Sequence, residues 1–204
     1  MAETQARTRI QKKNRVTILD AALDVFSQFG FRGSTLDQIA TASGLSKPNL
    51  LYYFPSKEAI HVELLSLLMD TWLDPLRDLD PTGDPKGEIL AYMRRKLEMS
   101  RKMPRESRLF ANEILQGAPR MIGAINGELK TLTDEKATVI SDWMEAGRIA
   151  KSDPYHLLFS IWSLTQHYAD FDVQVRAVLA GREDDPFVEA EHYLETLFSK
   201  MLTV

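Results

Sequence analysis

A short stretch of the sequence, residues 46–57, places hydrogen-bonding side chains among aromatic ones. An asparagine there can donate to and accept from the edge of a base, and a lysine can reach guanine or a phosphate. Hydroxyl groups of serine, threonine and tyrosine commonly hold the DNA backbone. We therefore expect contacts with double-stranded DNA from this stretch and from one threonine before it, through Thr35, Ser46, Lys47, Pro48, Asn49, Tyr52, Tyr53 and Lys57.

The pattern around this stretch predicts three helices. Apolar residues recur at helical spacing over residues 18–29, and Gly30 is expected to end that helix. Thr35 and Ser46 are N-cap candidates for two short helices, and Gly44 permits the sharp turn between them. This spacing is typical of a helix-turn-helix, in which the N-terminal end of the second short helix enters the major groove. Its core is expected to contain Phe26, Phe29, Ile39, Ala40, Leu45 and Leu50.

The charge distribution supports a segment that binds nucleic acid. The whole chain has a net charge of −4, but residues 1–60 hold eight basic and five acidic side chains, and the remainder has a net charge of −7. Residues 1–60, called the head here, are thus basic, and the remainder, called the body, is acidic. This indicates that only the head binds a polyanion. Charge alone does not decide this, and a three-helix bundle without DNA contact is the alternative.

Several classes of protein lack their characteristic residues here. The chain has no cysteine, which excludes disulfides, zinc ribbons and thiol nucleophiles. It has no dinucleotide-binding, P-loop, serine-hydrolase or zinc-protease motif, and its 4 histidines are scattered. We expect no enzyme activity, no cofactor and no metal site. Without a signal peptide or an apolar run of ~18 residues, the sequence predicts a cytoplasmic protein with no membrane partner.

Beyond the head, the pattern predicts an all-α body. A long helix is expected after Ser56, followed by helices at about residues 88–103, 105–116, 120–146, 153–180 and 186–203. About nine helices are expected in all. The predicted organisation is a flexible basic arm at residues 1–14, a three-helix helix-turn-helix domain at 15–56, and a helical ligand-binding and dimerisation domain at 57–204.

The predicted helix 153–180 carries polar side chains within an apolar pattern. Trp162, Gln166 and Asp170 are four residues apart and share one face of this helix. The carboxamide of Gln166 offers an acceptor beside donors, which suits a flat ligand with neighbouring N–H and carbonyl groups. The alternative is that Gln166 and His167 pair across a dimer interface. Periodicity leaves both interpretations open.

The long helix after the head adds aromatic surface to this candidate site. Trp72 or Trp162 can stack on a flat ligand, although burial in an apolar core is the alternative for Trp72. A ligand that touches Trp72 or Leu73 can tilt the helix that leads to the head. Glu113 is either a polar partner of the ligand or a surface carboxylate. The expected ligand-binding residues are Trp72, Leu73, Phe110, Trp162, Gln166 and Asp170.

The head resembles a known family of DNA-binding proteins. The motifs AALDVFSQFGF, STLDQIATASGLS, LYYF and SKE follow one another at the spacing found in the N-terminal domain of the tetracycline-repressor (TetR) family of bacterial transcriptional regulators. The resemblance implies an all-α homodimer in which each head reads one half of a near-palindromic operator. It also implies a C-terminal domain for a small-molecule effector, which usually releases the DNA.

The body resembles one branch of that family, the regulators of pyrimidine utilisation. The motifs are RLFANEILQGAP, LKTLTDEK, SDPYHLLFSIW and TQHYADFDVQV. They imply a repressor in the control of pyrimidine metabolism, with uracil or thymine as effector, and they favour Gln166 as a ligand contact while leaving His167 open. A TetR-type regulator of a different small molecule is the alternative. Helices 153–180 and 186–203 are expected to form the dimer interface, with burial inside one subunit as the alternative.

Overall fold

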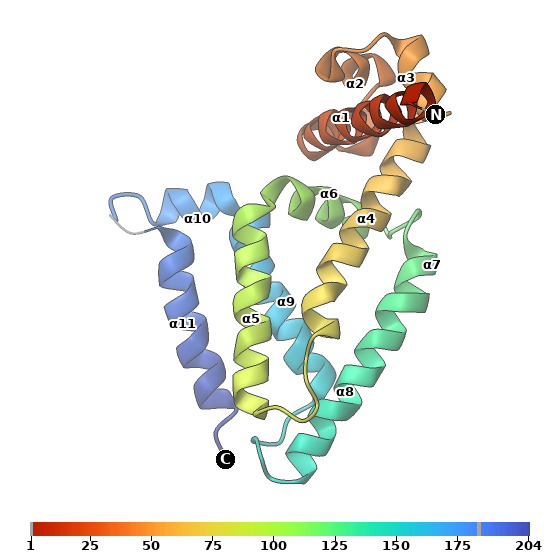
Figure 1. Cartoon of the computed structure of the whole chain (residues 1–204). Coiled ribbons are helices and arrows are strands. Elements are labelled where there is room, and N and C mark those ends of the chain that lie inside the picture. Colours follow the sequence, from red (N-terminus) through yellow and green to blue (C-terminus); the bar gives the residue numbers. More distant parts are fainter. Residues whose placement is uncertain (1, 183–184) are drawn as a thin grey trace. The chain divides into compact units, whose positions relative to one another are not determined.

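The computed structural model describes residues 2–182 and 185–204, and the elements within these ranges are all helices (Figure 1). The predicted all-α fold class is therefore confirmed. The chain divides into two compact units. The first comprises the residues up to Met69 together with Arg108–Met121, and the second comprises Asp70–Ser107 together with Ile122–Val204. Neither unit is a single continuous segment of the chain.

Three helices form the N-terminal part of the first unit: α1 (Ala2–Gly33), α2 (Leu36–Ser43) and α3 (Lys47–Tyr53). Thr35 and Gln38 form a capping box at the start of α2, and the side chain of Ser46 caps α3. Gly44 lies between the two helices in the left-handed conformation (φ 69°, ψ 18°), as the predicted turn requires. Local caps and one glycine thus encode the helix-turn-helix geometry.

Helix α1 begins earlier than the sequence analysis predicts. Residues 2–14, expected to be a flexible arm, are helical. This segment contains no proline or glycine, and its alanine, glutamate, glutamine, arginine and lysine residues favour a helix. The last turn of the segment also contacts α3, because Gln11 and Asn14 bond to the two tyrosines there.

The core of the first unit is built around Phe26, which is fully buried together with Ile39 and Leu50. Phe29 was expected in this core but is 53% exposed. The backbone leaves helical geometry at Gly30 (φ 65°, ψ 174°), so that Phe31 continues the aromatic packing in place of Phe29. The ring centroids of Phe26 and Phe31 are 6.0 Å apart.

The first unit also contains part of α4 (Lys57–Arg77) and most of α6 (Pro104–Leu115). The expected boundary after residue 56 therefore does not separate the two compact units. His61 of α4 accounts for part of this grouping, because its buried ring packs edge-on against Phe26 (4.7 Å between centroids) and Phe31 (4.9 Å).

The second unit contains seven further elements and the rest of α4. They are α5 (Pro85–Lys102), α7 (Ile122–Ala124), the π-helical turn η1 (Ile125–Leu129), α8 (Lys130–Glu145), α9 (Pro154–Asp170), α10 (Asp172–Val178) and α11 (Pro186–Met201). Helices α5, α9 and α11 each begin with an Asp–Pro pair. The aspartate side chain accepts a backbone N–H, and the proline occupies the first turn, where it costs no hydrogen bond.

The core of the second unit lies among α5, α8, α9 and α11, and Figure 1 shows α5 flanked by α9 and α11. Met93, Ile140, Leu158 and Phe198 are essentially unexposed, and burying each such side chain is worth about 1.5–3 kcal/mol. No helix within the described ranges is long and apolar enough to cross a membrane.

Two predicted helices are divided in the structure. The segment 153–180 breaks at Phe171 (φ −112°, ψ 27°), between α9 and α10, with no proline or glycine at the break. The segment 120–146 contains Gly123 and Gly127, each of which weakens a helix by about 1 kcal/mol. It divides into α7, η1 and α8.

Candidate DNA interface and effector site

The start of α3 presents its side chains to solvent. Residues 46–49 are all exposed, whereas Leu50 is fully buried. Leu50 thus anchors the helix while Ser46, Lys47, Pro48 and Asn49 face outward. The Lys47 ammonium lies 2.9 Å from a carboxylate oxygen of Asp37 in an exposed ion pair. Such pairs contribute little to stability, so this lysine can exchange its partner for a base or a phosphate.

The end of α3 carries Tyr52 and Tyr53, which α1 holds in place. Their hydroxyl oxygens accept hydrogen bonds from the side-chain amides of Gln11 (3.2 Å) and Asn14 (2.9 Å), respectively. The two rings meet edge-on with centroids 5.2 Å apart. Because each hydroxyl acts as an acceptor in these contacts, its hydrogen is left to donate to a phosphate oxygen.

Helix α1 adds residues that the sequence analysis did not select. Gln11, Lys12 and Arg15 line a hollow of about 430 Å³ together with the two tyrosines. Lys12 is exposed, whereas Arg15 is paired with Glu63. The signal in the sequence is the basic run RIQKKNR at residues 9–15, which becomes part of a surface only when a helix places it beside α3.

Lys57 is engaged within the protein. Its ammonium nitrogen donates to the backbone carbonyls of Phe31 (2.7 Å) and Ser34 (2.6 Å) and lies over the ring of Phe31, 4.4 Å from the centroid. Two of its three N–H groups therefore stabilise the end of α1, where free carbonyls favour a cation. Lys57 thus joins α4 to α1, and its expected phosphate contact stays a prediction.

Thr35 is also engaged within the protein. Its N–H donates to the side-chain oxygen of Gln38 (2.7 Å), and its hydroxyl oxygen accepts the Gln38 N–H (3.2 Å). The hydroxyl lies 3.1 Å from the same Gln38 oxygen. Without DNA, both groups satisfy the first turn of α2, so the expected phosphate contact would have to replace these bonds and stays a prediction.

Three residues of the predicted effector set lie on α9 of the second unit, and one of them contacts α5. The indole N–H of Trp162 donates to the hydroxyl of Tyr92 (2.6 Å), which fixes the register of the two helices. Burial raises the pKa of Tyr92, so its hydroxyl stays protonated. Gln166 lies one turn after Trp162 and is half-buried, and Asp170 accepts a hydrogen bond from the hydroxyl of Ser107.

Trp72 of α4 is buried beside a lysine that the sequence analysis missed. Lys96 of α5 is only 6% exposed, and its ammonium nitrogen lies 5.0 Å from the centroid of the Trp72 ring. Burial lowers the pKa of Lys96 to about 8. Lys96 follows Tyr92 by four residues on the buried face of α5, but this spacing alone does not show which helices cover that face.

Four other positions singled out in the sequence have different surroundings. Leu73 is buried in the second unit, and its expected contact with a ligand stays a prediction. Phe110 belongs to the first unit, so its place in an effector site stays a prediction. Glu113 is not a surface carboxylate, because its buried carboxylate accepts from the backbone N–H (2.8 Å) and guanidinium (3.1 Å) of Arg120, and its contact with a ligand stays a prediction. His167 is exposed, and its ring stacks on Phe171.

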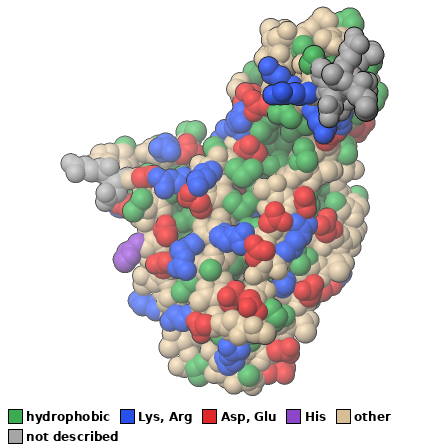
Figure 2. All heavy atoms as spheres, viewed as in Figure 1, with side chains coloured by type: hydrophobic (Ala, Val, Ile, Leu, Met, Phe, Trp, Pro, Cys, Tyr) green, Lys and Arg blue, Asp and Glu red, His purple; other side chains and the backbone are tan. Residues whose placement is uncertain are grey.

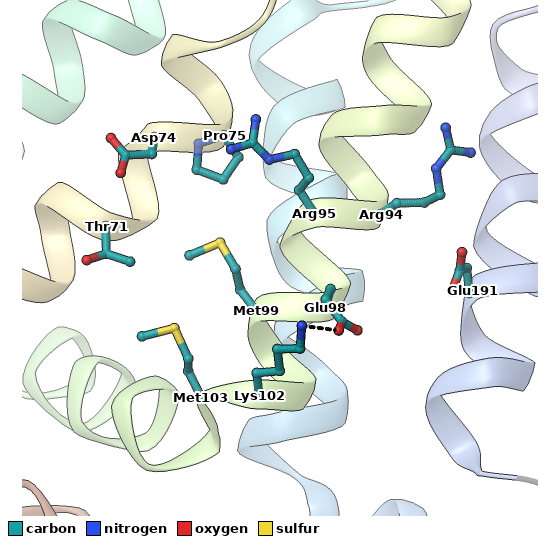
Figure 3. Close-up of a pocket in the computed structure, with 10 residues that line it drawn as sticks. All are labelled: Thr71, Asp74, Pro75, Arg94, Arg95, Glu98, Met99, Lys102, Met103 and Glu191. Atoms are coloured by element: carbon teal, nitrogen blue, oxygen red, sulfur yellow. Dashed lines mark ion pairs between the residues drawn. The ribbon is translucent and has the colours of Figure 1, made fainter.

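An open groove of about 560 Å³ lies beside α5 (Figure 3). Its side chains come from α4, α5 and α11, and none belongs to the predicted effector set. Its charges are compensated, since Arg94 pairs with Glu195, Arg95 with Asp78 and Lys102 with Glu98. Figure 2 likewise shows basic and acidic side chains intermingled over the helical body. The groove therefore lacks the buried polar groups that orient a small ligand.

Two family models match adjoining parts of the chain. The model of bacterial regulatory proteins of the tetR family matches residues 18–64, and the model of the C-terminal region of YcdC-like proteins matches residues 65–204. The chain belongs to the TetR family. This TetR-family member is 50% identical over 175 residues to the HTH-type transcriptional regulator RutR of Escherichia coli strain K12. The match covers 86% of this chain and 82% of RutR.

Solved structures show the same TetR fold. The transcriptional regulator SCO4942 from Streptomyces coelicolor has a TM-score of 0.70 at 24% identity, over 93% of this chain and 98% of that one. AibR, in a structure with isovaleryl coenzyme A and operator DNA, has a TM-score of 0.70 at 18% identity, over 90% of this chain and 97% of that one. The protein is thus a DNA-binding, RutR-like transcriptional regulator of the TetR family, and not an enzyme.

Proposed function

We propose that this TetR regulator is a cytoplasmic homodimeric repressor that leaves its operator when it binds a flat pyrimidine dione such as uracil or thymine. The observation that carries the proposal is the amide of Gln166, which belongs to the same unit as the aromatic rings of Trp162 and Trp72. Gln166 follows Trp162 by one helical turn, and the buried ring of Trp72 belongs to the same unit. An amide beside indole rings suits a planar ring with neighbouring N–H and carbonyl groups.

The similarity to RutR supports the choice of ligand class. The 50% identity extends over most of the chain, and the body motifs that imply a regulator of pyrimidine utilisation include both Trp162 and Gln166. Trp162 and Gln166 lie more than 100 positions after α3 in the sequence. The proposal therefore requires that binding in the second unit changes the DNA affinity of the head, as a ligand does when it favours one of two conformations.

The proposed dimer places two α3 helices on one near-palindromic operator. Half-sites on one face of B-DNA are about 34–36 Å apart, so a small change in the separation of the heads weakens the fit. Helices α9 and α11 support self-association, because both keep large apolar side chains exposed on the single chain. These are Tyr155, Phe159, Val188, Tyr193 and Met201. A four-helix interface between two copies would cover them.

Calorimetric titration with uracil and thymine tests this proposal, with cytosine as the control ligand. We expect saturable binding of the two diones, and a loss of about tenfold or more when Gln166→Ala removes the amide. The unliganded protein should retain an operator selected from random DNA, and uracil should release it. Trp72→Ala should keep operator binding but lose most of the release. Absence of dione binding by the unmodified protein would refute the pyrimidine ligand.

A further inference from the structure

Lys96 is the strongest unexplained group in the second unit. We propose that Lys96 is the specificity-determining cation of the effector site, where it donates to the 4-carbonyl oxygen of a pyrimidine dione and thereby selects diones over 4-amino-pyrimidines such as cytosine. This inference rests on the proposed function and adds to it the residue that defines the ligand class. Neither the helical pattern of the sequence nor the similarity to RutR assigns a role to this lysine.

The first support is the burial of an ammonium group that has no acceptor of its own. Lys96 is 6% exposed, and its ammonium nitrogen lies over the ring of Trp72 and takes part in no hydrogen bond or ion pair within residues 2–182 and 185–204. An ammonium group carries three donors, and burying it unpaired is costly. A methionine of similar length would fill the same space without that cost. The lysine is thus better suited to receiving a ligand than to supporting the core.

The second support is its position relative to Gln166. The hydrogen bond between Trp162 and Tyr92 aligns α9 with α5, and the two helices run side by side in the same direction (Figure 1). Gln166 and Lys96 each lie four residues, or about one turn, beyond that pair. Both therefore reach the same level between the helices. Trp72, whose ring lies 5.0 Å from the ammonium nitrogen, provides an aromatic surface there.

The Gln166 carboxamide and the Lys96 ammonium would recognise different groups of the ligand. The carboxamide of Gln166 can turn over and present either an acceptor or a donor, so it accommodates a carbonyl or an amino group on the ligand. The ammonium of Lys96 can only donate. It accepts a carbonyl oxygen as partner, whereas an amino group at the same position would face it with another donor. A ligand with that amino group leaves both donors unsatisfied, which is how buried polar sites discriminate.

The test compares uracil and cytosine binding by calorimetry at pH 7 in four proteins. They are the unmodified chain, Lys96→Met, Lys96→Gln and the control Lys102→Met, which removes an exposed lysine on the groove face of α5. We expect Lys96→Met to weaken uracil binding by about tenfold or more. Lys96→Gln should retain some uracil affinity but lose most of the preference over cytosine, because an amide serves either ligand. Lys102→Met should match the unmodified chain.

The outcomes separate this inference from the proposed function. If the unmodified chain binds uracil and both Lys96 variants keep its affinity and its preference, Lys96 is a core cation held by Trp72 and the inference is wrong. If the Lys96 variants instead weaken uracil and cytosine binding by the same factor, Lys96 does not discriminate between the two ligands, and the inference is again wrong. If the unmodified chain binds neither dione, the proposed ligand class fails first and the role of Lys96 fails with it. Melting temperatures check that each variant is folded.

Discussion

At the scale of single residues, burial decides which side chains are committed to the fold and which remain available to a ligand or DNA. Lys57 and Lys96 have the same side chain and opposite situations. Lys57 has two carbonyl acceptors at 2.7 and 2.6 Å, whereas Lys96 has an aromatic ring at 5.0 Å. The first is a structural cation, and the second carries a cost in the unliganded protein that a suitable ligand can offset.

Lys96→Met should stabilise the unliganded protein at pH 7. Burial lowers the pKa of Lys96 from 10.5 to about 8, so below pH 8 the folded state carries a charge that it disfavours. The unfolded state holds this proton up to pH 10.5, and the unfavourable contribution therefore disappears as the pH rises from 8 to 10.5. We expect an advantage of up to about 3 kcal/mol for the variant at pH 7, shrinking toward pH 10.

Urea denaturation at a series of pH values measures this difference, with Lys102→Met as the matched control. A variant that is less stable than the unmodified protein at pH 7 would show that the contact with Trp72 outweighs the cost of burial.

Lys57→Met should destabilise the first unit. The substitution removes two short, charge-assisted hydrogen bonds and leaves the carbonyls of Phe31 and Ser34 without this donor. Bonds to charged groups contribute about 1.5–3 kcal/mol each, and water can replace part of them, so we expect a loss of about 2–4 kcal/mol. Thermal and chemical denaturation measure the loss, with the exposed Lys13→Met as control. Unchanged stability together with weaker operator binding would support the phosphate role that the sequence suggests.

At the scale of elements, the sequence predicts features that depend on neighbouring residues, and it does not predict contacts between residues far apart in the chain. The caps of α2 and α3 and the left-handed Gly44 depend on residues within three or four positions, so Thr35, Ser46 and Gly44 were predicted correctly. The break at Phe171 has no such signal. The fixed position of Lys57 depends on Phe31 and Ser34, more than twenty residues earlier, and the burial of Lys96 depends on which helices cover α5.

The same distinction applies to the candidate sites. The exposed start of α3 followed from a cap and a single buried leucine, and both can be read from the sequence pattern. The alignment of Tyr92 with Trp162 joins residues 70 positions apart, and no periodicity within either helix contains it. The aromatic and amide members of the effector set could therefore be proposed from α9 alone, whereas the lysine opposite them required the packed structure.

The junction of α4 with the end of α6 predicts a defined acid sensitivity. His61 is buried, with its Nδ1 4.0 Å from the Glu113 carboxylate. Burial and the nearby Arg120 and Lys57 lower the pKa of His61 to about 4. The unfolded state takes up this proton below pH 6.5 and the folded state only near pH 4, so stability is lost as the pH falls between these values. The loss amounts to roughly 3 kcal/mol at most.

His61→Phe should remove much of that acid sensitivity. A phenylalanine keeps a ring between Phe26 and Phe31, and it cannot be protonated. Denaturation between pH 7 and pH 4 measures the effect, and the exposed His192→Gln provides the control. If the variant loses stability as steeply as the unmodified chain, the responsible group lies elsewhere in the protein.

At the scale of the whole molecule, the charges of the head should determine how operator binding responds to salt. The logarithm of the binding constant falls with the logarithm of salt concentration by about 0.9 for each phosphate contacted. Lys12 is an exposed cation beside Tyr52 and Tyr53, so Lys12→Ala should reduce the slope by about 1. Asn49→Ala should lower affinity by about 1–3 kcal/mol at the preferred site and leave the slope unchanged, because it removes a base contact.

Fluorescence anisotropy with a labelled operator at several salt concentrations gives both quantities. Equal slopes for the unmodified protein and Lys12→Ala would place α1 away from the phosphates. A changed slope for Asn49→Ala would reassign that residue from base reading to backbone contact.

The discontinuous first unit bears on the building of hybrid regulators. Exchanging sensor domains between relatives invites a cut near residue 64, where the match to the tetR-family model ends. Such a graft would take His61 away from Glu113, and Phe31 away from the Arg120 guanidinium that stacks 3.6 Å from its ring centroid. A transplant that carries residues 108–121 along with the head would preserve both contacts. The part of this regulator that can be transplanted as a unit therefore consists of two separate segments of the chain, and no single cut in the sequence delimits it.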